Sequence, residues 1–361
     1  MNFISVLGRW VNRYFSRPDA IFLVAAIIAV SAVLYVLAGA LAPVLTGLVI
    51  AFLLQGLVER LESIGCHRLL AIVIAMVVLI GSVFAIVLLV VPLVWQQASS
   101  LLALAPLVIG MLRDGLSGLA ARFPEFITEE QILGVVNESS KELGNLSAFL
   151  LESAFSQVFS LFGLLIYLVL VPISVFFLLK DKETLMAHLL SLLPKDRPLL
   201  DAVGLEMNAQ LGNYVRGKAI EILVVGTVSF IIFLFFGLNY AALLSVVVGV
   251  SVLVPFIGAA IVTLPVFVIA VLQFGWSLDL GWVMLAYAVI QFLDGNVLVP
   301  LLFSEAVDLH PITIIVAVLA FGGLWGLWGV FFAIPLATLI KAIYVAWPRA
   351  TDGDSQPATA L

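Results

Sequence analysis

Long apolar runs without a charged side chain are the feature that most constrains the fold of this chain. Residues 20–41 read AIFLVAAIIAVSAVLYVLAGAL, which is 22 positions with no acidic or basic residue. As an α-helix this run would be about 33 Å long, enough to cross the hydrocarbon core of a bilayer, which is about 30 Å thick. It exceeds the apolar core of about 7 to 15 residues found in signal peptides. The run predicts a transmembrane helix.

The composition extends this interpretation to the whole chain. Hydrophobic residues make up 64% of the 361 residues and charged residues 11%, whereas soluble domains average about 45 to 50% and about 25%. A water-soluble core could not absorb so much apolar surface. We expect an all-α, polytopic membrane protein.

The apolar sequence divides into about eight segments. They cover residues 20–41, 43–58, 69–94, 155–179, 219–236, 240–272, 282–303 and 312–345, with Pro43 separating the first two. Two of them are 33 and 34 residues long and are interrupted, one by PFIG at 255–258 and the other by GGLWGLWG at 322–329. We expect both to be broken helices. The sequence leaves open whether each crosses the membrane fully or is re-entrant.

The domain organisation follows from these segments. Residues 1–94 hold a cytoplasmic N-terminal segment and three helices, 95–155 an extracytoplasmic loop domain of amphipathic helices, and 156–218 the fourth helix with a cytoplasmic loop. Residues 219–347 form a C-terminal bundle, and 348–361 a disordered cytoplasmic tail. Within the cytoplasmic loop, we interpret residues 193–221 as a solvated helix that leads into the fifth segment.

The distribution of basic residues sets the expected orientation. With the N-terminus inside, 13 of the 16 Lys and Arg residues fall on the cytoplasmic side, and the other three lie in the 95–155 loop. This is the bias of a multipass protein of a bacterial inner membrane with both termini cytoplasmic. The single cysteine, Cys66, excludes an intrachain disulfide.

Motifs for catalysis are absent from the sequence. The three histidines lack HExxH spacing, and neither a Walker loop nor GxGxxG occurs. Cys66 and His67 alone fall short of a zinc ligand set. We therefore expect no enzyme activity, no cofactor, no metal and no nucleic-acid partner. Any transport would be passive or driven by a gradient.

Ionisable residues inside apolar segments are the sharpest functional signal, because they are costly to insert and commonly mark transport paths. Asp294, in VIQFLDGNVLVPLLF, lies close to the middle of its segment. It could line a path, cap a helix that breaks at Asp-Gly-Asn, or do both. Glu221 is the second candidate, although it could pair with Lys218 at i, i+3.

Several uncharged residues accompany these two carboxylates as candidates for the path. Gln291 shares a helical face with Asp294, although interhelical hydrogen bonding is the commoner role for such a glutamine. Asn296 joins that face only if the helix breaks. Pro255 and Gly258 would expose backbone carbonyls at the PFIG turn, unless the turn is a simple kink.

Six stretches cover most of the apolar segments in order: LAPVLTGLVIAFLLQGLVERLE, LVLVPISVFFLLKDKE, NYVRGKAIE, VLVPFIGAAIVTLP, DGNVLVPLLFSEAVDLHP and FGGLWGLWGVFFAIPLATLIKAI. Together they resemble the autoinducer-2 exporter family, and most closely its PerM-like permeases. Five residues fall on the family pattern: Asn296, Pro300, Leu309, His310 and Pro311. Asp294 occupies a position that is often acidic in the family. This match adds Pro300 and His310 to the candidates.

The resemblance implies eight membrane segments, a large outside loop and assembly into a homo-oligomer such as a pentamer. It also implies transport. Leu301, Ser304 and Glu305 depart from the wider family pattern, which weakens the assignment of autoinducer-2 as substrate more than the assignment of the fold. We expect a permease or exporter of a small polar solute or signalling molecule in the lipid bilayer. A sodium/proton antiporter and a non-transporting membrane scaffold are the alternatives.

Overall fold

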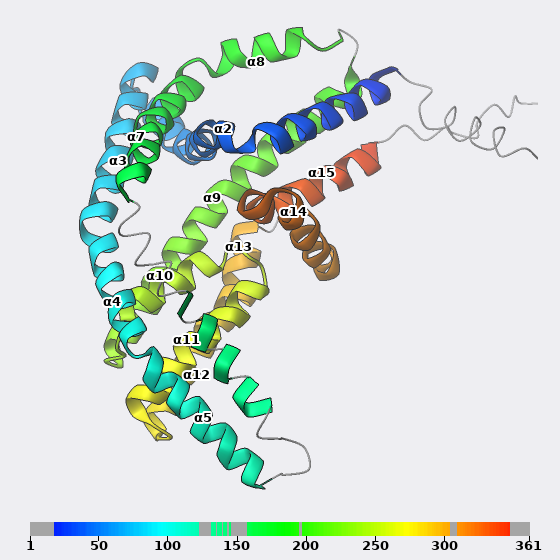
Figure 1. Ribbon diagram of the computed structural model, residues 1–361. Coiled ribbons are helices and arrows are strands. Elements are labelled where there is room, and N and C mark those ends of the chain that lie inside the picture. Colours follow the sequence, from blue (N-terminus) through cyan, green and yellow to red (C-terminus); the bar gives the residue numbers. More distant parts are fainter. Residues whose placement is uncertain are drawn as a thin grey trace, which may run out of the picture. The chain divides into compact units, whose positions relative to one another are not determined.

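The computed structural model describes residues 18–122, 131–134, 136–138, 140–142, 144–145, 157–194, 197–303 and 309–346. These residues are almost entirely helical (Figure 1). The larger elements are α2 (Pro18–Ser63), α3 (Arg68–Ala85), η1 (Ile86–Val90), α4 (Val91–Ala103), α5 (Ala105–Arg122), α7 (Gln157–Lys180), α8 (Lys182–Ser191), α9 (Pro198–Phe235), α10 (Ala241–Ser251), α11 (Ile257–Phe274), α12 (Leu278–Leu293), η2 (Asp294–Leu298), α13 (Val299–Phe303), α14 (Pro311–Phe331) and α15 (Ala333–Ala346).

Among the described residues, six helices are long and apolar enough to cross a membrane. They are Gly39–Ser63, Arg68–Ala103, Pro198–Phe235, Ile257–Phe274, Leu278–Phe303 and Pro311–Phe331. Shorter apolar helices cover Ile21–Leu37, Ile166–Lys180, Ala241–Ser251 and Ala333–Tyr344. These helices confirm the expectation of an all-α polytopic membrane protein.

Both long apolar segments with Gly and Pro interruptions are broken helices, as predicted. The first separates into α10 and α11, with Phe256 at φ 62° between them. In the second, Gly326 leaves helical geometry at φ 57° and ψ −135°, and a further break at Phe332 separates α14 from α15.

The expectation that Pro43 separates two helices is wrong. Helix α2 runs without interruption from Pro18 to Ser63, and Pro43 lies inside it. A proline removes one backbone donor from a helix, and membrane helices tolerate this loss when neighbouring groups satisfy the freed carbonyl. Pro172 in α7 and Pro265 in α11 also lie inside their helices.

The chain forms two compact units. Unit 1 comprises Met1–Gly56, Ser174–Gly217 and Phe303–Leu361, and unit 2 comprises Leu57–Ile173 and Lys218–Leu302. The sequence-based regions do not map onto this division. The N-terminal residues 1–17, most of the 123–156 segment and the tail from 347 onward lie outside the described residues.

Unit 1 is held together by α2, α9, α14 and α15. Leu23 of α2 packs with Leu199 and Val203 of α9, and side chains of α15 cover this cluster. Farther along α9, the hydroxyl of Tyr214 donates a 2.8 Å hydrogen bond to the carbonyl of Phe331 at the end of α14. These contacts join segments that are more than a hundred residues apart in sequence.

Unit 2 has its core where α9, α10, α11 and α12 meet. Phe233 of α9, Val248 of α10, Val266 of α11 and Val283 of α12 are fully buried there. Helix α4 joins this core through Gln97, whose side-chain oxygen accepts a 2.8 Å hydrogen bond from the backbone N–H of Leu243. That N–H belongs to the first turn of α10, where helices leave backbone donors unsatisfied.

Candidate functional site

A close helix crossing in unit 2 positions the candidate site. A Cβ at Gly249 of α10 would lie 3.0 Å from the Cα of Gly226 and from the carbonyl oxygen of Ile222, both on α9. Any larger residue at position 249 would therefore separate the two helices. The crossing brings the α9 turn before Ile222 beside the end of α10.

Lys218 and Glu221 lie on that turn of α9 and are both buried. The Lys218 ammonium donates a 2.8 Å hydrogen bond to the carbonyl of Val252 and lies 2.8 Å from Oε2 of Glu221. Their side chains are 5% and 2% exposed. The contact between Lys218 and Glu221 is a buried ion pair. The i, i+3 pairing considered from the sequence is confirmed.

The carbonyl of Val252 is available because the chain leaves the helix at this point. Helix α10 ends at Ser251, Pro255 supplies no N–H, and Ile257 donates to the carbonyl of Pro255 at 2.7 Å. Gly258 is buried against the carbonyl of Ser251, where a Cβ would clash with the backbone. Pro255 and Gly258 thus shape the break between α10 and α11.

Asp294 does not cap a broken helix, which corrects one of the two sequence interpretations. It has right-handed helical geometry, and its backbone N–H bonds to carbonyls of the preceding turn. The chain continues through the π-helical turn η2 into α13. The Asp-Gly-Asn sequence therefore widens the helix by one π-turn, and single π-turns are frequent at functional sites.

The carboxylate of Asp294 belongs to the same charge cluster as Lys218 and Glu221. Its Oδ1 is buried and has no hydrogen-bond partner among the described residues. The charge on Lys218 attracts Asp294, and Asp294 repels Glu221. One ammonium thus faces two carboxylates. We call Lys218, Glu221 and Asp294 the unit 2 charge cluster.

A chain of hydrogen bonds connects the Asp294 helix to α11. The side-chain amide of Gln291 donates to the hydroxyl of Tyr287 at 2.9 Å, and Tyr287 lies 3.3 Å from the hydroxyl of Thr263. Thr263 also bonds to the carbonyl of Ala259 at 2.8 Å. Since a hydroxyl has one proton, Thr263 can donate to Ala259 while Tyr287 donates to Thr263. Gln291 thus takes part in joining two helices.

The remaining sequence candidates lie elsewhere. Asn296 is exposed, and its amide donates to the carbonyl of Phe292 at 2.9 Å. Pro300 is exposed on α13. His310 belongs to unit 1, where its Nδ1 accepts from the backbone N–H of Ile312 at 3.3 Å and caps α14. The structure brings Asp294 together with Glu221. Asn296, Pro300 and His310 are not part of the charge cluster.

The sequence interpretation of residues 193–221 as a helix that leads into the fifth segment is confirmed over α9, but the expectation that Lys218 is solvated there is wrong. The structure extends α9 across residues 198–235, and Lys218 is 4% exposed within it. The sequence feature that could have identified Lys218 as part of the site was its position one helical turn before Glu221. No local sequence feature indicated that the carbonyl of Val252 accepts from Lys218 or that Tyr287 bonds to Gln291 and Thr263. These interactions depend on how the helices pack.

Comparison with known proteins identifies the family. Residues 21–349 match the family described as AI-2E family transporter. The chain is 44% identical to an Escherichia coli K12 protein named "Putative permease PerM", over 96% of this chain and 98% of that protein. It is 26% identical to "Putative transport protein YrrI" of Bacillus subtilis, over 85% and 86% of the two chains. These matches confirm the resemblance seen in the sequence. The chain belongs to the AI-2E transporter family.

Proposed function

We propose that this membrane transport protein is a permease for a small polar solute or signalling molecule, and that a proton or sodium gradient drives it through Asp294. The observation that carries the proposal is the buried Oδ1 of Asp294, which has no hydrogen-bond partner among the described residues. Its neighbours Lys218 and Glu221 already form an ion pair. With both carboxylates ionised, the charge cluster holds one more negative charge than positive.

Excess charge in a region of low polarity requires compensation. A buried, uncompensated charge costs several kcal/mol, so a proton or a cation at Asp294 would be strongly favoured. Binding and release of that cation would change the field at Lys218, which also holds the carbonyl of Val252. The state of Asp294 would thereby act on the break between α10 and α11.

The break itself supports a path for a polar solute. Non-helical backbone at membrane depth is tolerated where protein or a water-filled cavity covers it, and discontinuous helices form the substrate sites of many transporters. Pro255 and Gly258 shape this break, and we propose that it lines the path together with Gln291 and Asp294. The family description makes an autoinducer-2-like molecule the first solute to test.

The test is a transport assay with purified protein in liposomes. The wild type, Asp294→Asn and Asp279→Asn are compared for uptake of candidate solutes, with and without an imposed proton or sodium gradient. Asp279 is an exposed carboxylate in the first turn of the same helix, so it controls for loss of charge. We expect Asp294→Asn to abolish the gradient dependence and Asp279→Asn to retain it. Gradient-driven uptake that survives Asp294→Asn contradicts the proposal.

A sodium/proton antiporter is the second candidate, because two carboxylates beside one ammonium also suit exchange of a cation for a proton. Sodium-driven proton flux without any solute, lost in Asp294→Asn, would favour this alternative. Absence of every flux in folded, reconstituted protein would favour a non-transporting scaffold.

A further inference from the structure

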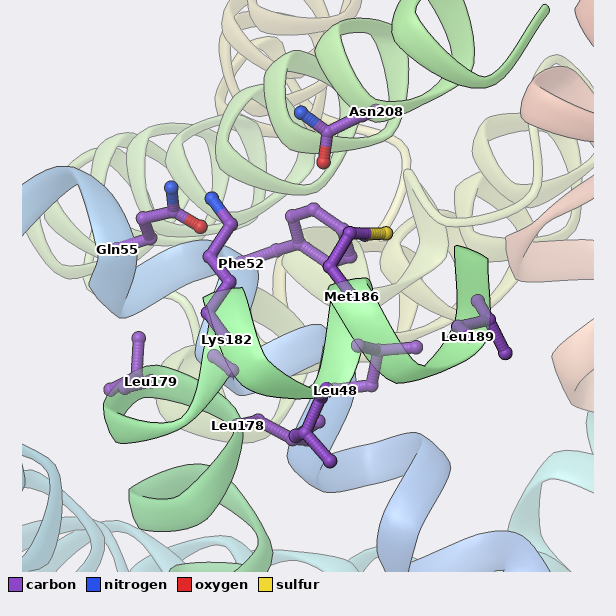
Figure 2. A pocket seen from close by; sticks show the side chains of 11 residues that line it. Leu48, Phe52, Gln55, Leu178, Leu179, Lys182, Met186, Leu189 and Asn208 are labelled. Carbon is purple, nitrogen blue, oxygen red and sulfur yellow. The ribbon is translucent and has the colours of Figure 1, made fainter. Parts of the chain in front are cut away.

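Unit 1 contains a cavity of about 360 Å³ that is separate from the charge cluster. It lies between α2, the end of α7, α8 and α9 (Figure 2). Its walls are formed mainly by leucines together with Phe52 of α2 and Met186 of α8, and its polar groups are Gln55, Lys182 and Asn208. A volume above about 300 Å³ lies in the range of ligand-binding pockets.

The connections on both sides of α8 are short and tied down. The chain leaves α7 at Lys180, turns at Asp181 and enters α8 at once. After α8, the guanidinium of Arg197 donates to the carbonyls of Leu190 and Pro194 and pairs with Asp201 of α9 at 2.9 Å. This side chain ties the end of α8 to the start of α9. Helix α8 is thus fixed across the cavity.

Helix α8 carries large apolar side chains that unit 1 does not bury. Leu185 is 47% exposed and Leu189 is 60% exposed, and both line the cavity. A short helix with exposed leucines that follows a membrane helix is suited to the boundary between headgroups and acyl chains. The surroundings of the cavity therefore favour a lipid.

The polar end of the cavity favours an anion. Gln55 of α2 and Lys182 of α8 both line the cavity, together with the apolar side chains of Leu48 and Leu178 (Figure 2). Lys182 forms no ion pair with any described residue. Basic residues in pockets between membrane helices commonly bind anionic lipid headgroups, especially on the cytoplasmic side. The basic segment 180–218, which contains Lys182, is expected on that side.

We propose that this cavity binds an anionic phospholipid, with an acyl chain among the apolar side chains and the phosphate on Lys182. An uncharged lipid would leave Lys182 unused, and a small polar solute would gain little from the leucine walls. The inference does not depend on the transport proposal, because the two sites share no residue.

The test measures lipid retention by the full-length protein in detergent. Purified and delipidated protein is incubated with phosphatidylglycerol or with phosphatidylcholine of the same acyl chains, and bound lipid is counted by native mass spectrometry. Lys182→Gln removes the charge. Lys180→Gln is the matched control, because Lys180 lies two residues away over the rings of Phe176 and Phe177 and does not line the cavity. Leu185→Trp fills the cavity from an exposed position.

We expect the wild type to retain phosphatidylglycerol in preference to phosphatidylcholine. Lys182→Gln should lower this retention about fivefold, the effect of one basic residue near an anionic headgroup. Lys180→Gln should leave it unchanged, and Leu185→Trp should lower retention of both lipids. Leu189→Trp replaces Leu185→Trp if the latter does not elute as folded protein.

Three results would overturn the inference. Equal losses in the two lysine variants would show general surface attraction. Unchanged retention in a folded cavity-filling variant would place the acyl chain elsewhere. Glycerol phosphate that competes as well as intact phosphatidylglycerol would identify a site for a free anion and not for a lipid.

Discussion

Lys218 is the residue on which the charge cluster depends. Among the described residues, it is the cation that acts on both Glu221 and Asp294, and it also binds the carbonyl of Val252. Removing one partner of a buried ion pair leaves a charge without compensation, which costs about 3 to 5 kcal/mol. Lys218 therefore contributes to folding as well as to the electrostatics of Asp294.

We predict that Lys218→Met destabilises the protein by about 3 to 5 kcal/mol. Glu221→Gln should cost less, because Lys218 then faces Asp294 alone and the charges balance. The double variant should be more stable than the sum of the two single changes predicts, because the variants share one interaction. Thermal unfolding of the purified protein in detergent measures all three. Additive losses would mean that Lys218 and Glu221 do not stabilise each other.

At the scale of single residues, the sequence identified the unusual side chains but not all of their partners. Asp294 and Glu221 stood out because a carboxylate in an apolar run is costly wherever the run lies. The contact of Lys218 with Glu221 could be foreseen from helical spacing. Its hydrogen bond to Val252 and its attraction to Asp294 could not, since both residues lie far along the sequence and only the fold brings them near α9.

Breaks in the helices were predictable to different degrees. Pro255 with Gly258 and the glycines of GGLWGLWG interrupt helices as expected, because several local signals coincide at each. Pro43 alone did not interrupt α2, since membrane helices tolerate a proline where other groups satisfy the freed carbonyl. Asp-Gly-Asn at 294–296 became a π-turn, which keeps the helix continuous and has no distinctive sequence pattern.

The close crossing of α9 and α10 leads to a prediction about how a larger residue at position 249 affects the packing of these two helices. Gly249→Ala would place a Cβ 3.0 Å from the backbone of α9, and backbone atoms cannot move aside as a flexible side chain can. We expect a loss of about 1 to 3 kcal/mol, the usual cost of overpacking. The shift of α10 should also weaken the contact between Lys218 and Val252.

Gly281→Ala is the matched control for this prediction. Gly281 lies inside α12, and a Cβ there would meet nothing within 4 Å. Alanine in the interior of a helix is favoured over glycine by up to about 1 kcal/mol. The control should melt at or above the temperature of the wild type, while Gly249→Ala melts below it. Equal melting temperatures for the two variants would show that α9 and α10 do not need the close approach.

At the scale of the whole molecule, the orientation in the membrane stays a prediction. The distribution of Lys and Arg places the connection around Cys66 inside and the 95–155 loop outside. The expected separation of two segments at Pro43 placed the N-terminus on the same side as Cys66, and the uninterrupted α2 lacks that separation. The orientation is therefore best tested on either side of the next long helix, Arg68–Ala103, which at about 54 Å exceeds the thickness of the bilayer core.

The single cysteine makes this test direct. A membrane-impermeant maleimide should label Cys66 in spheroplasts only after the membrane is permeabilised, because the turn after α2 is cytoplasmic in the predicted orientation. In a Cys66→Ser background, Ser117→Cys on the exposed surface of α5 should be labelled in intact spheroplasts. Cys66→Ser alone should not be labelled. The opposite pattern would reverse the orientation. Labelling of both positions from one side would show that Arg68–Ala103 does not cross the membrane once, since one crossing must separate its two ends.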